Sequence, residues 1–131
     1  MNLNKTEEDY ALEMFKQRRE EEFLYYYEVL SPNVQSGAMM LDENEPEWWK
    51  VVDLSALDIS SSEYCICGQA FSTKAAEMEY SNGYDWATSE LSPVVHHGSE
   101  FFGFCADKSI EYQMLDYLWT QEVKARWELL A

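Results

Sequence analysis

Basic residues are scarce in this chain: 9 Lys and Arg stand against 25 Asp and Glu, which gives a formal net charge of −16 over 131 residues. Binding to nucleic acid depends on Lys and Arg side chains that neutralise phosphates, so this composition excludes a broad DNA- or RNA-binding surface. The same charge opposes attachment to an anionic membrane. The composition therefore favours a positively charged protein as the partner.

Long apolar runs and a secretion signal are also missing. No stretch approaches the roughly 18 apolar residues that a membrane-spanning helix requires, and the first five residues lack the apolar centre of a signal peptide. The three cysteines are odd in number, which without a signal peptide is typical of a reducing compartment. We therefore expect a cytoplasmic protein that does not enter membranes.

Catalytic motifs are equally scarce. The five glycines are scattered and form neither a phosphate-binding loop nor a nucleophile elbow. Carboxylates are so numerous that no pair stands out for acid–base catalysis. A cysteine nucleophile can be assembled on paper from Cys65 or Cys105 with His96 or His97, but the acidic surroundings disfavour a thiolate. We expect a protein that is not an enzyme and that uses no cofactor.

One set of residues has metal-binding chemistry: Cys65, Cys67, His96, His97 and Cys105. Zinc prefers four thiolate or imidazole ligands in tetrahedral geometry. The spacing of Cys65 and Cys67 is tighter than in usual zinc sites, and residues two apart on a helix do not share a face. Buried, inert cysteines and a surface pair of histidines are therefore the favoured interpretation, with a zinc-stabilised domain as an alternative.

Apolar and aromatic residues make up 47% and 15% of the chain, too much for a disordered acidic protein. We expect one compact, mainly α domain over residues 1–131 with long helices at both ends. Its parts would be an acidic helix over 1–31 and an aromatic-rich core over 39–131.

The first helix has a capping-box pattern at Thr6 and Asp9 and should end at Ser31, because a residue before proline disfavours helical geometry. A loop would follow around Gly37. The apolar stripe of this helix would comprise Leu12, Phe15, Phe23, Tyr26 and Leu30. The further expected elements are a helix beginning at Pro46, short helices over 61–71 and 72–80, either a hairpin or a long loop over 84–104, and a last helix over 107–129.

Carboxylates that a fold holds in fixed positions can imitate nucleic-acid phosphates on a basic protein surface. Acidic residues concentrate in the first helix and in segment 42–47, and exposed aromatic residues are typical interface anchors. The predicted partner-binding residues are the acids Glu7, Glu8, Glu20, Glu21, Asp42, Glu43, Glu45 and Glu47 and the aromatics Tyr25 and Trp48. For any single acidic run, a solvated face without a partner is the simpler interpretation.

The segments 53–61 and 65–69 resemble small uncharacterised proteins of actinobacterial phages, which read D-L-x-x-L-D-L-S-S-C-x-x-C-V-L-G-Q. The resemblance extends over residues 47–130. The chain departs from the pattern at Ser62 and Cys67, where the family has Cys and Leu. No activity is established for this family, so the resemblance implies a phage setting and no mechanism.

Together these features predict a phage-type acidic protein that inhibits a basic, nucleic-acid-handling or defence protein of its host by DNA mimicry, in the manner of anti-CRISPR or anti-restriction proteins. The alternatives are a small regulatory protein with an apolar interface, in which charge serves solubility alone, and the zinc-stabilised domain. The sequence leaves the oligomeric state open.

Overall fold

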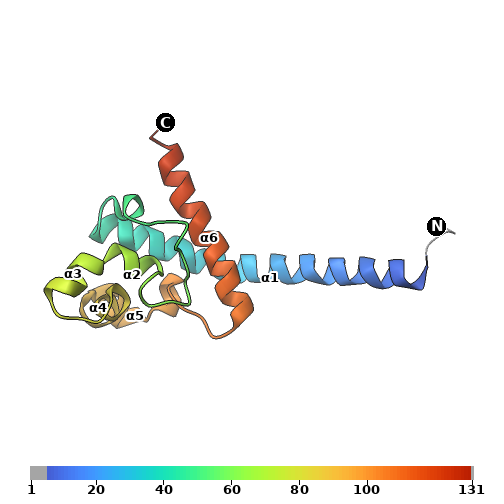
Figure 1. Cartoon of the computed structure of the whole chain (residues 1–131), viewed down its shortest axis with the longest axis horizontal. Coiled ribbons are helices and arrows are strands. Elements are labelled where there is room, and N and C mark those ends of the chain that lie inside the picture. The colour runs from blue at the N-terminus through green and yellow to red at the C-terminus, as the bar shows by residue number, and fades with distance from the viewer. Residues whose placement is uncertain (1–5, 131) are drawn as a thin grey trace.

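The computed structural model describes residues 6–130, apart from the side chain of Phe15 (Figure 1). These residues form α1 (Glu7–Asn44), η1 (Trp48–Lys50), α2 (Ile66–Ala70), α3 (Ser72–Glu77), α4 (Gly83–Glu90), α5 (Ser92–His97), η2 (Glu100–Phe102) and α6 (Ser109–Glu128), where η denotes a 3₁₀ turn. No strand occurs among the described residues, so the mainly α prediction is confirmed. The expectation of a hairpin or a long loop over 84–104 is wrong in both forms, because that stretch folds into α4, α5 and η2.

Helix α1 begins as its sequence predicts. The Thr6 hydroxyl accepts a hydrogen bond from the Asp9 N–H at 3.2 Å, and the Asp9 carboxylate accepts one from the Thr6 N–H at 3.1 Å. This reciprocal pair satisfies two N–H groups that the start of a helix would otherwise leave without partners. Acidic side chains in the first turn further favour the helix start through its dipole.

The expected end of this helix at Ser31 is wrong, because α1 continues through Pro32 to Asn44. Pro32 has no N–H to donate to the carbonyl four residues earlier, which normally interrupts a helix. The Ser31 hydroxyl donates to the Tyr27 carbonyl at 2.5 Å nearby. Beyond the proline, Val34 and Leu41 are fully buried, and burial of such side chains contributes about 1.5–3 kcal/mol each. Packing against the core therefore outweighs the local cost of the proline.

Gly37 lies inside α1 and not in the predicted loop. A Cβ atom at this position would come within 2.0 Å of the Phe102 carbonyl oxygen and 3.0 Å of the Trp119 ring. The absence of a side chain thus lets α1 lie directly against η2 and α6. Glycine is here a requirement of close packing.

The core is aromatic and centres on α6. The Trp119 ring meets Trp48 edge-on at 5.7 Å and stacks on Phe104 at 5.6 Å between ring centroids. The Trp119 indole N–H donates to the Gly103 carbonyl at 2.7 Å, so its one polar atom has a partner. The aromatic-rich core predicted from residue 39 onward is present, but it begins earlier, at Leu30 on α1.

The short helices differ most from expectation. The helix expected at Pro46 is only the 3₁₀ turn η1, and the helix expected over 61–71 is the single turn α2. Cys65 caps α2, since its sulfur accepts from the Gly68 N–H at 3.2 Å. The last helix is confirmed as α6, within two residues at each end of its predicted bounds. One member of the predicted apolar stripe, Phe15, has its side chain outside the described residues.

Substituting Gly37 with alanine should destabilise the fold by about 1–3 kcal/mol or more, because the methyl group overlaps backbone across the packed helices. The matched control is Gln35→Ala in the same helix, where the side chain is exposed and the change should stay within about 0.5 kcal/mol. Urea unfolding followed by circular dichroism measures both. Equal midpoints for the two variants would contradict the close approach of α1 to η2 and α6.

Candidate functional site

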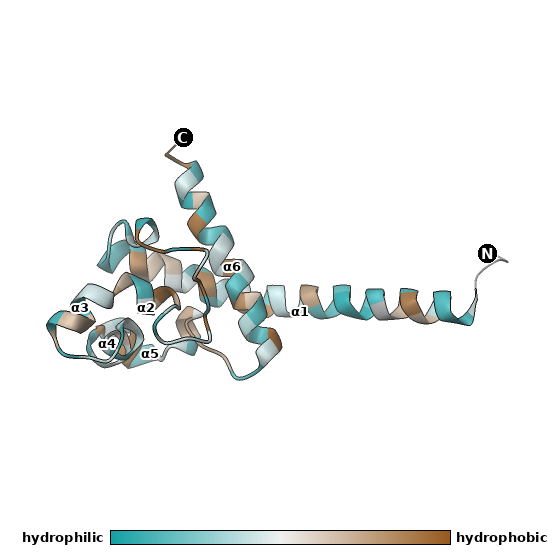
Figure 2. Cartoon of the chain, in the orientation of Figure 1, coloured by the Kyte–Doolittle hydropathy of each residue, from teal (hydrophilic) through white to brown (hydrophobic). Residues whose placement is uncertain are grey.

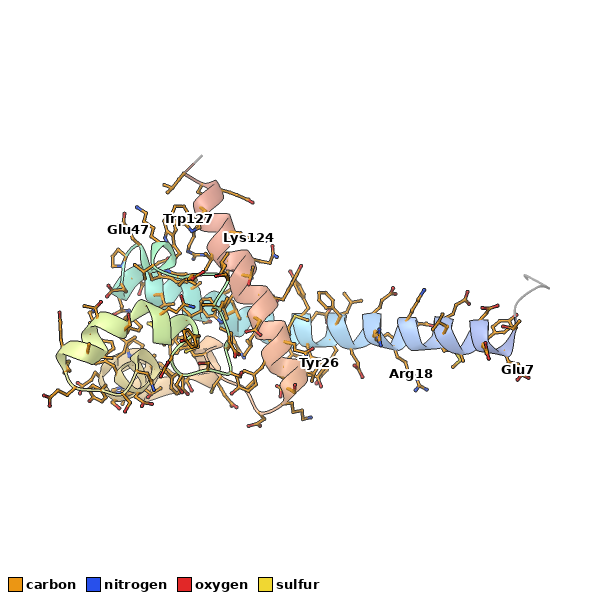
Figure 3. All side chains as sticks on the ribbon, viewed as in Figure 1. Glu7, Arg18, Tyr26, Glu47, Lys124 and Trp127 are labelled. Carbon is orange, nitrogen blue, oxygen red and sulfur yellow. The ribbon has the colours of Figure 1, made fainter. Side chains whose placement is uncertain are left out.

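The amino-terminal half of α1 projects from the globular part of the molecule (Figure 1). We call residues 7–29 the α1 arm. Among its described side chains only Tyr26 is partly buried and all others are exposed. At about 1.5 Å per helical residue the arm is about 35 Å long. Figure 3 shows Glu7 at its tip, Arg18 along its length and Tyr26 where it meets α6.

The arm holds half of the acids predicted to bind a partner. Glu7, Glu8, Glu20 and Glu21 are all exposed, and within residues 6–130 no ion pair ties them to another side chain. Their carboxylates therefore lie on a helix that stands in solvent.

Asp42, in the second acidic segment, is used differently. Its carboxylate accepts two hydrogen bonds from Arg126 of α6, at 3.1 and 2.8 Å, and one from the Trp48 indole N–H at 2.8 Å. Partial desolvation acts to raise its pKa, but the hydrogen bonds from Arg126 and Trp48 and the charge of Arg126 outweigh it, so the pKa lies below its ordinary value of 3.8. Asp42 thus joins the end of α1 to α6.

Two other acids of that segment also bind cations of the same chain. Glu45 pairs with Lys74 at 2.9 Å and Glu47 with Lys50 at 2.8 Å. Glu43 remains exposed beside them. Three of the four acids of segment 42–47 are therefore paired with cations of the same chain, although Asp42, Glu43 and Glu47 remain exposed, whereas Glu7, Glu8, Glu20 and Glu21 of the arm have no such ion pair within residues 6–130.

The two predicted aromatic anchors also separate. Tyr25 is 60% exposed on the arm and meets Tyr26 edge-on at 5.0 Å. Trp48 is 1% exposed, so the prediction that it anchors a partner is wrong. Its ring is covered because it packs on Trp119 and lies under the Arg126 guanidinium, 5.2 Å from the ring centroid.

Two of the cysteines, Cys65 and Cys67, are buried and poorly suited to act as nucleophiles. Burial raises the pKa of the Cys65 thiol to about 11 and that of Cys67 well above its ordinary value. A thiol nucleophile requires the opposite shift. Cys105 lies 2.8 Å from the Ser99 hydroxyl, which in turn lies 2.9 Å from the Tyr84 hydroxyl.

The histidines are engaged elsewhere. His96 Nδ1 lies 3.1 Å from the Ser92 carbonyl, and His97 stacks on Phe101 at 5.1 Å. Within the part of the chain that the structure describes, no three His, Cys, Asp or Glu side chains come together in a way that could hold a metal ion. The geometry therefore does not fit the zinc-stabilised alternative.

The segment 53–69 has a structural role. The Gln69 side chain accepts from the Asp53 N–H at 2.6 Å and donates to the Tyr64 carbonyl at 2.9 Å. Asp116 of α6 accepts from the Ile59 N–H at 2.7 Å. These bonds hold the loop 53–61 against α2 and α6, so this motif supports the fold and lies apart from the arm.

The apolar stripe predicted for the first helix lies largely in solvent, which was not predicted from the sequence. Two of its members, Leu12 and Phe23, are 58% and 44% exposed, and Figure 2 shows hydrophobic residues along the helix outside the globular part. At the base of the arm, α1 and α6 border a groove of about 460 Å³. Its lining residues are Arg19, Glu22, Phe23 and Tyr26 of α1 and Ile110, Gln113, Met114 and Tyr117 of α6.

The apolar stripe of the first helix could have indicated this exposed surface, because it continues over more turns than the core of a 131-residue chain is able to cover.

No protein-family model, curated protein or solved structure matches the chain. Over residues 6–130, none of the helices has both the length and the apolar character needed to cross a bilayer.

Replacing Asp42 with asparagine should lower the melting temperature by a few degrees at neutral pH, because Arg126 and Trp48 lose a charged acceptor. The folded pKa of Asp42 lies below the unfolded one, so its stabilisation is present above pH 3.8 and is lost as the pH falls through the folded value. The difference from the wild type should therefore shrink in acid. Glu43→Gln is the control, and an equal deficit at neutral and acidic pH would contradict this role.

Proposed function

We propose that this chain is a phage-type acidic binding protein that inhibits a basic, nucleic-acid-handling or defence protein of the host cytoplasm, in the manner of anti-CRISPR or anti-restriction proteins. The observation that carries the proposal is the α1 arm: a rigidly attached helix that presents exposed carboxylates about 35 Å outward from the core. The phage setting comes from the resemblance at residues 53–69.

The arm suits a basic groove in its charge and dimensions. It carries eight acids and three bases, and an α-helix with its side chains is about 10–12 Å across. The exposed pairs Glu7–Glu8 and Glu20–Glu21 are about 20 Å apart along the axis. A partner would meet two separated anionic sites, with Tyr25 available as an aromatic contact beside the second.

A helix attached at one end is also easily reached by a large partner. The core end of α1 is held by Gly37, Leu41 and Asp42 through the contacts described above. Asp42 therefore helps to fix the base of the arm, and the acids of the arm give long-range attraction, which chiefly raises association rates and depends on salt.

A quadruple variant tests this function: Glu7→Gln, Glu8→Gln, Glu20→Gln and Glu21→Gln. Immobilised wild type should capture its partner from actinobacterial lysate at about 50 mM salt and lose roughly tenfold or more at about 500 mM. The captured protein, once identified by mass spectrometry, should lose binding to its own nucleic acid when the wild-type chain is added.

The matched control carries the same change in net charge on the globular part: Glu63→Gln, Glu77→Gln, Glu79→Gln and Glu100→Gln, all exposed. The arm variant should lose capture and inhibition, and the control should retain most of both. Equal losses in the two variants would show that net charge alone matters, and an unaffected arm variant would overturn the proposal.

A further inference from the structure

The α1 arm exposes more apolar surface than a solitary helix in water normally does. Eight of its large apolar side chains are between 43% and 60% exposed: Tyr10, Leu12, Phe23, Leu24, Tyr25, Tyr27 and Val29, together with Met14. Exposed apolar surface of this kind marks interaction sites when it is contiguous, and most of the stability of helices in proteins comes from packing of an apolar face. The exposed apolar side chains therefore favour a covering partner for reasons that charge does not explain.

One stripe of the arm continues the face of α1 that packs in the core. Leu12, Arg19, Phe23, Tyr26 and Leu30 follow one another at spacings of seven, four, three and four, so they lie on one side of the helix. Beyond Leu30 this side is buried against η2 and α6. Among the described residues, α6 covers this side of the arm only at the groove, beside Phe23 and Tyr26, and nearer the tip the side has no covering element.

The order of charges along the arm is self-complementary in one orientation only. The bases Lys16 and Arg18 precede the acids Glu20 and Glu22, and within residues 6–130 no ion pair joins Lys16 or Arg18 to another side chain. If two arms lie antiparallel, the basic segment of each faces the acidic segment of the other. If they lie parallel, like charges meet, which is destabilising.

The positions of these charged residues around the helix are also consistent with an antiparallel pair. Lys16 and Glu20 are four residues apart and flank the apolar stripe on one side, and Arg18 and Glu22 flank it on the other. In a two-fold pair centred at Arg19, Lys16 of each copy lies within about 3 Å along the axis of Glu20 of the other, and Arg18 lies as near to Glu22. Each of these opposite-charge contacts occurs twice by symmetry, whereas the like pairs Glu20–Glu20 and Arg18–Arg18, at the same offset, occur once each. The two central Arg19 side chains are then surrounded by glutamates of both copies.

The apolar residues of the two arms are also related by the two-fold axis at Arg19. Leu12 and Tyr26 are each seven residues from Arg19, so Leu12 of one copy lies level with Tyr26 of the other. Tyr26 lines the groove between α1 and α6, whose volume of about 460 Å³ is in the range that receives bulky ligands. Phe23 and Tyr117, edge-on at 5.5 Å, form one wall.

We propose that a second copy of this chain covers the α1 arm: two arms pair antiparallel about Arg19, and the Leu12 region of each copy occupies the groove of the other. This inference goes beyond the proposed function and does not depend on it. The side of the arm that bears Glu13, Glu21 and Glu28 at helical spacing stays turned from the seam, so a dimer retains outward carboxylates, of which Glu20 is not one because it pairs with Lys16 across the seam.

Sedimentation equilibrium of the full chain tests the pairing. The mass should be twice the 15.4 kDa of one chain. Moderate salt should not weaken the dimer, because it screens the repulsion between two strongly acidic chains, whereas the same salt weakens capture of a basic partner. Leu12→Glu should raise the dissociation constant roughly tenfold or more, and the control Val95→Glu, an exposed apolar position on α5, should leave it unchanged.

Exchanging the charged residues of the arm tests how the two arms are aligned, and it uses more than one variant. Lys16→Glu with Arg18→Glu, and separately Glu20→Lys with Glu22→Lys, should each weaken the dimer. The four changes combined invert the order of charges and should restore it.

Cross-linking tests the orientation. Leu12→Cys with Tyr26→Cys in one chain should form a covalent dimer on mild oxidation, because the two positions are about 21 Å apart within a helix and level between antiparallel copies. Leu12→Cys alone should not. A monomeric wild type, an unaffected Leu12→Glu variant, or equal cross-linking by Leu12→Cys alone would overturn the proposal, whatever the outcome of the capture experiment.

Discussion

The close approach of α1 to η2 and α6 at Gly37 is the contact on which the rest of the structure depends. A backbone-to-backbone fit, with the Phe102 carbonyl where a Cβ would otherwise stand, brings the buried side of α1 onto Trp119. The arrangement of Trp48, Phe104 and Arg126 around this position follows from it. Because α1 is one continuous helix, the direction of the arm is set by the same contact. The packing at this single glycine therefore determines where the surface of the arm lies, about 30 Å away.

The acidic residues divide into two groups that have different physical consequences. Near the core, Asp42, Glu45 and Glu47 each have a cation within 3 Å, and Asp42 additionally satisfies the Trp48 indole. On the arm, carboxylates remain in water, where their mutual repulsion is screened but still disfavours compaction. Repulsion of this kind is compatible with an extended helix and would oppose folding the arm back onto the globular part. The excess of negative charge is thus consistent with the shape of the molecule.

The sequence predicted those features that depend on local chemistry. The capping box at Thr6, the final helix and the exposure of Tyr25 all follow from patterns within a few residues. The features that it failed to predict depend on contacts between distant residues. Pro32 is tolerated because Val34 and Leu41 find a core, and Trp48 is buried because Trp119 and Arg126 cover it. In the sequence, the acids of the segment 42–47 look like those of the arm. Only the position of α6 shows that Arg126 forms an ion pair with Asp42.

Pro32 has one further consequence. Since it supplies no N–H, the carbonyl of Glu28 lacks its regular helical donor, and the ladder of hydrogen bonds in α1 is interrupted close to where the arm leaves the core. The missing bond divides the hydrogen-bond ladder of α1 into a part that lies mainly in the arm and a part that packs in the core. Unwinding that starts at the tip can therefore proceed along the arm and stop there, so amide protons before Pro32 exchange with solvent by fraying, while those after it are released only when the whole core opens.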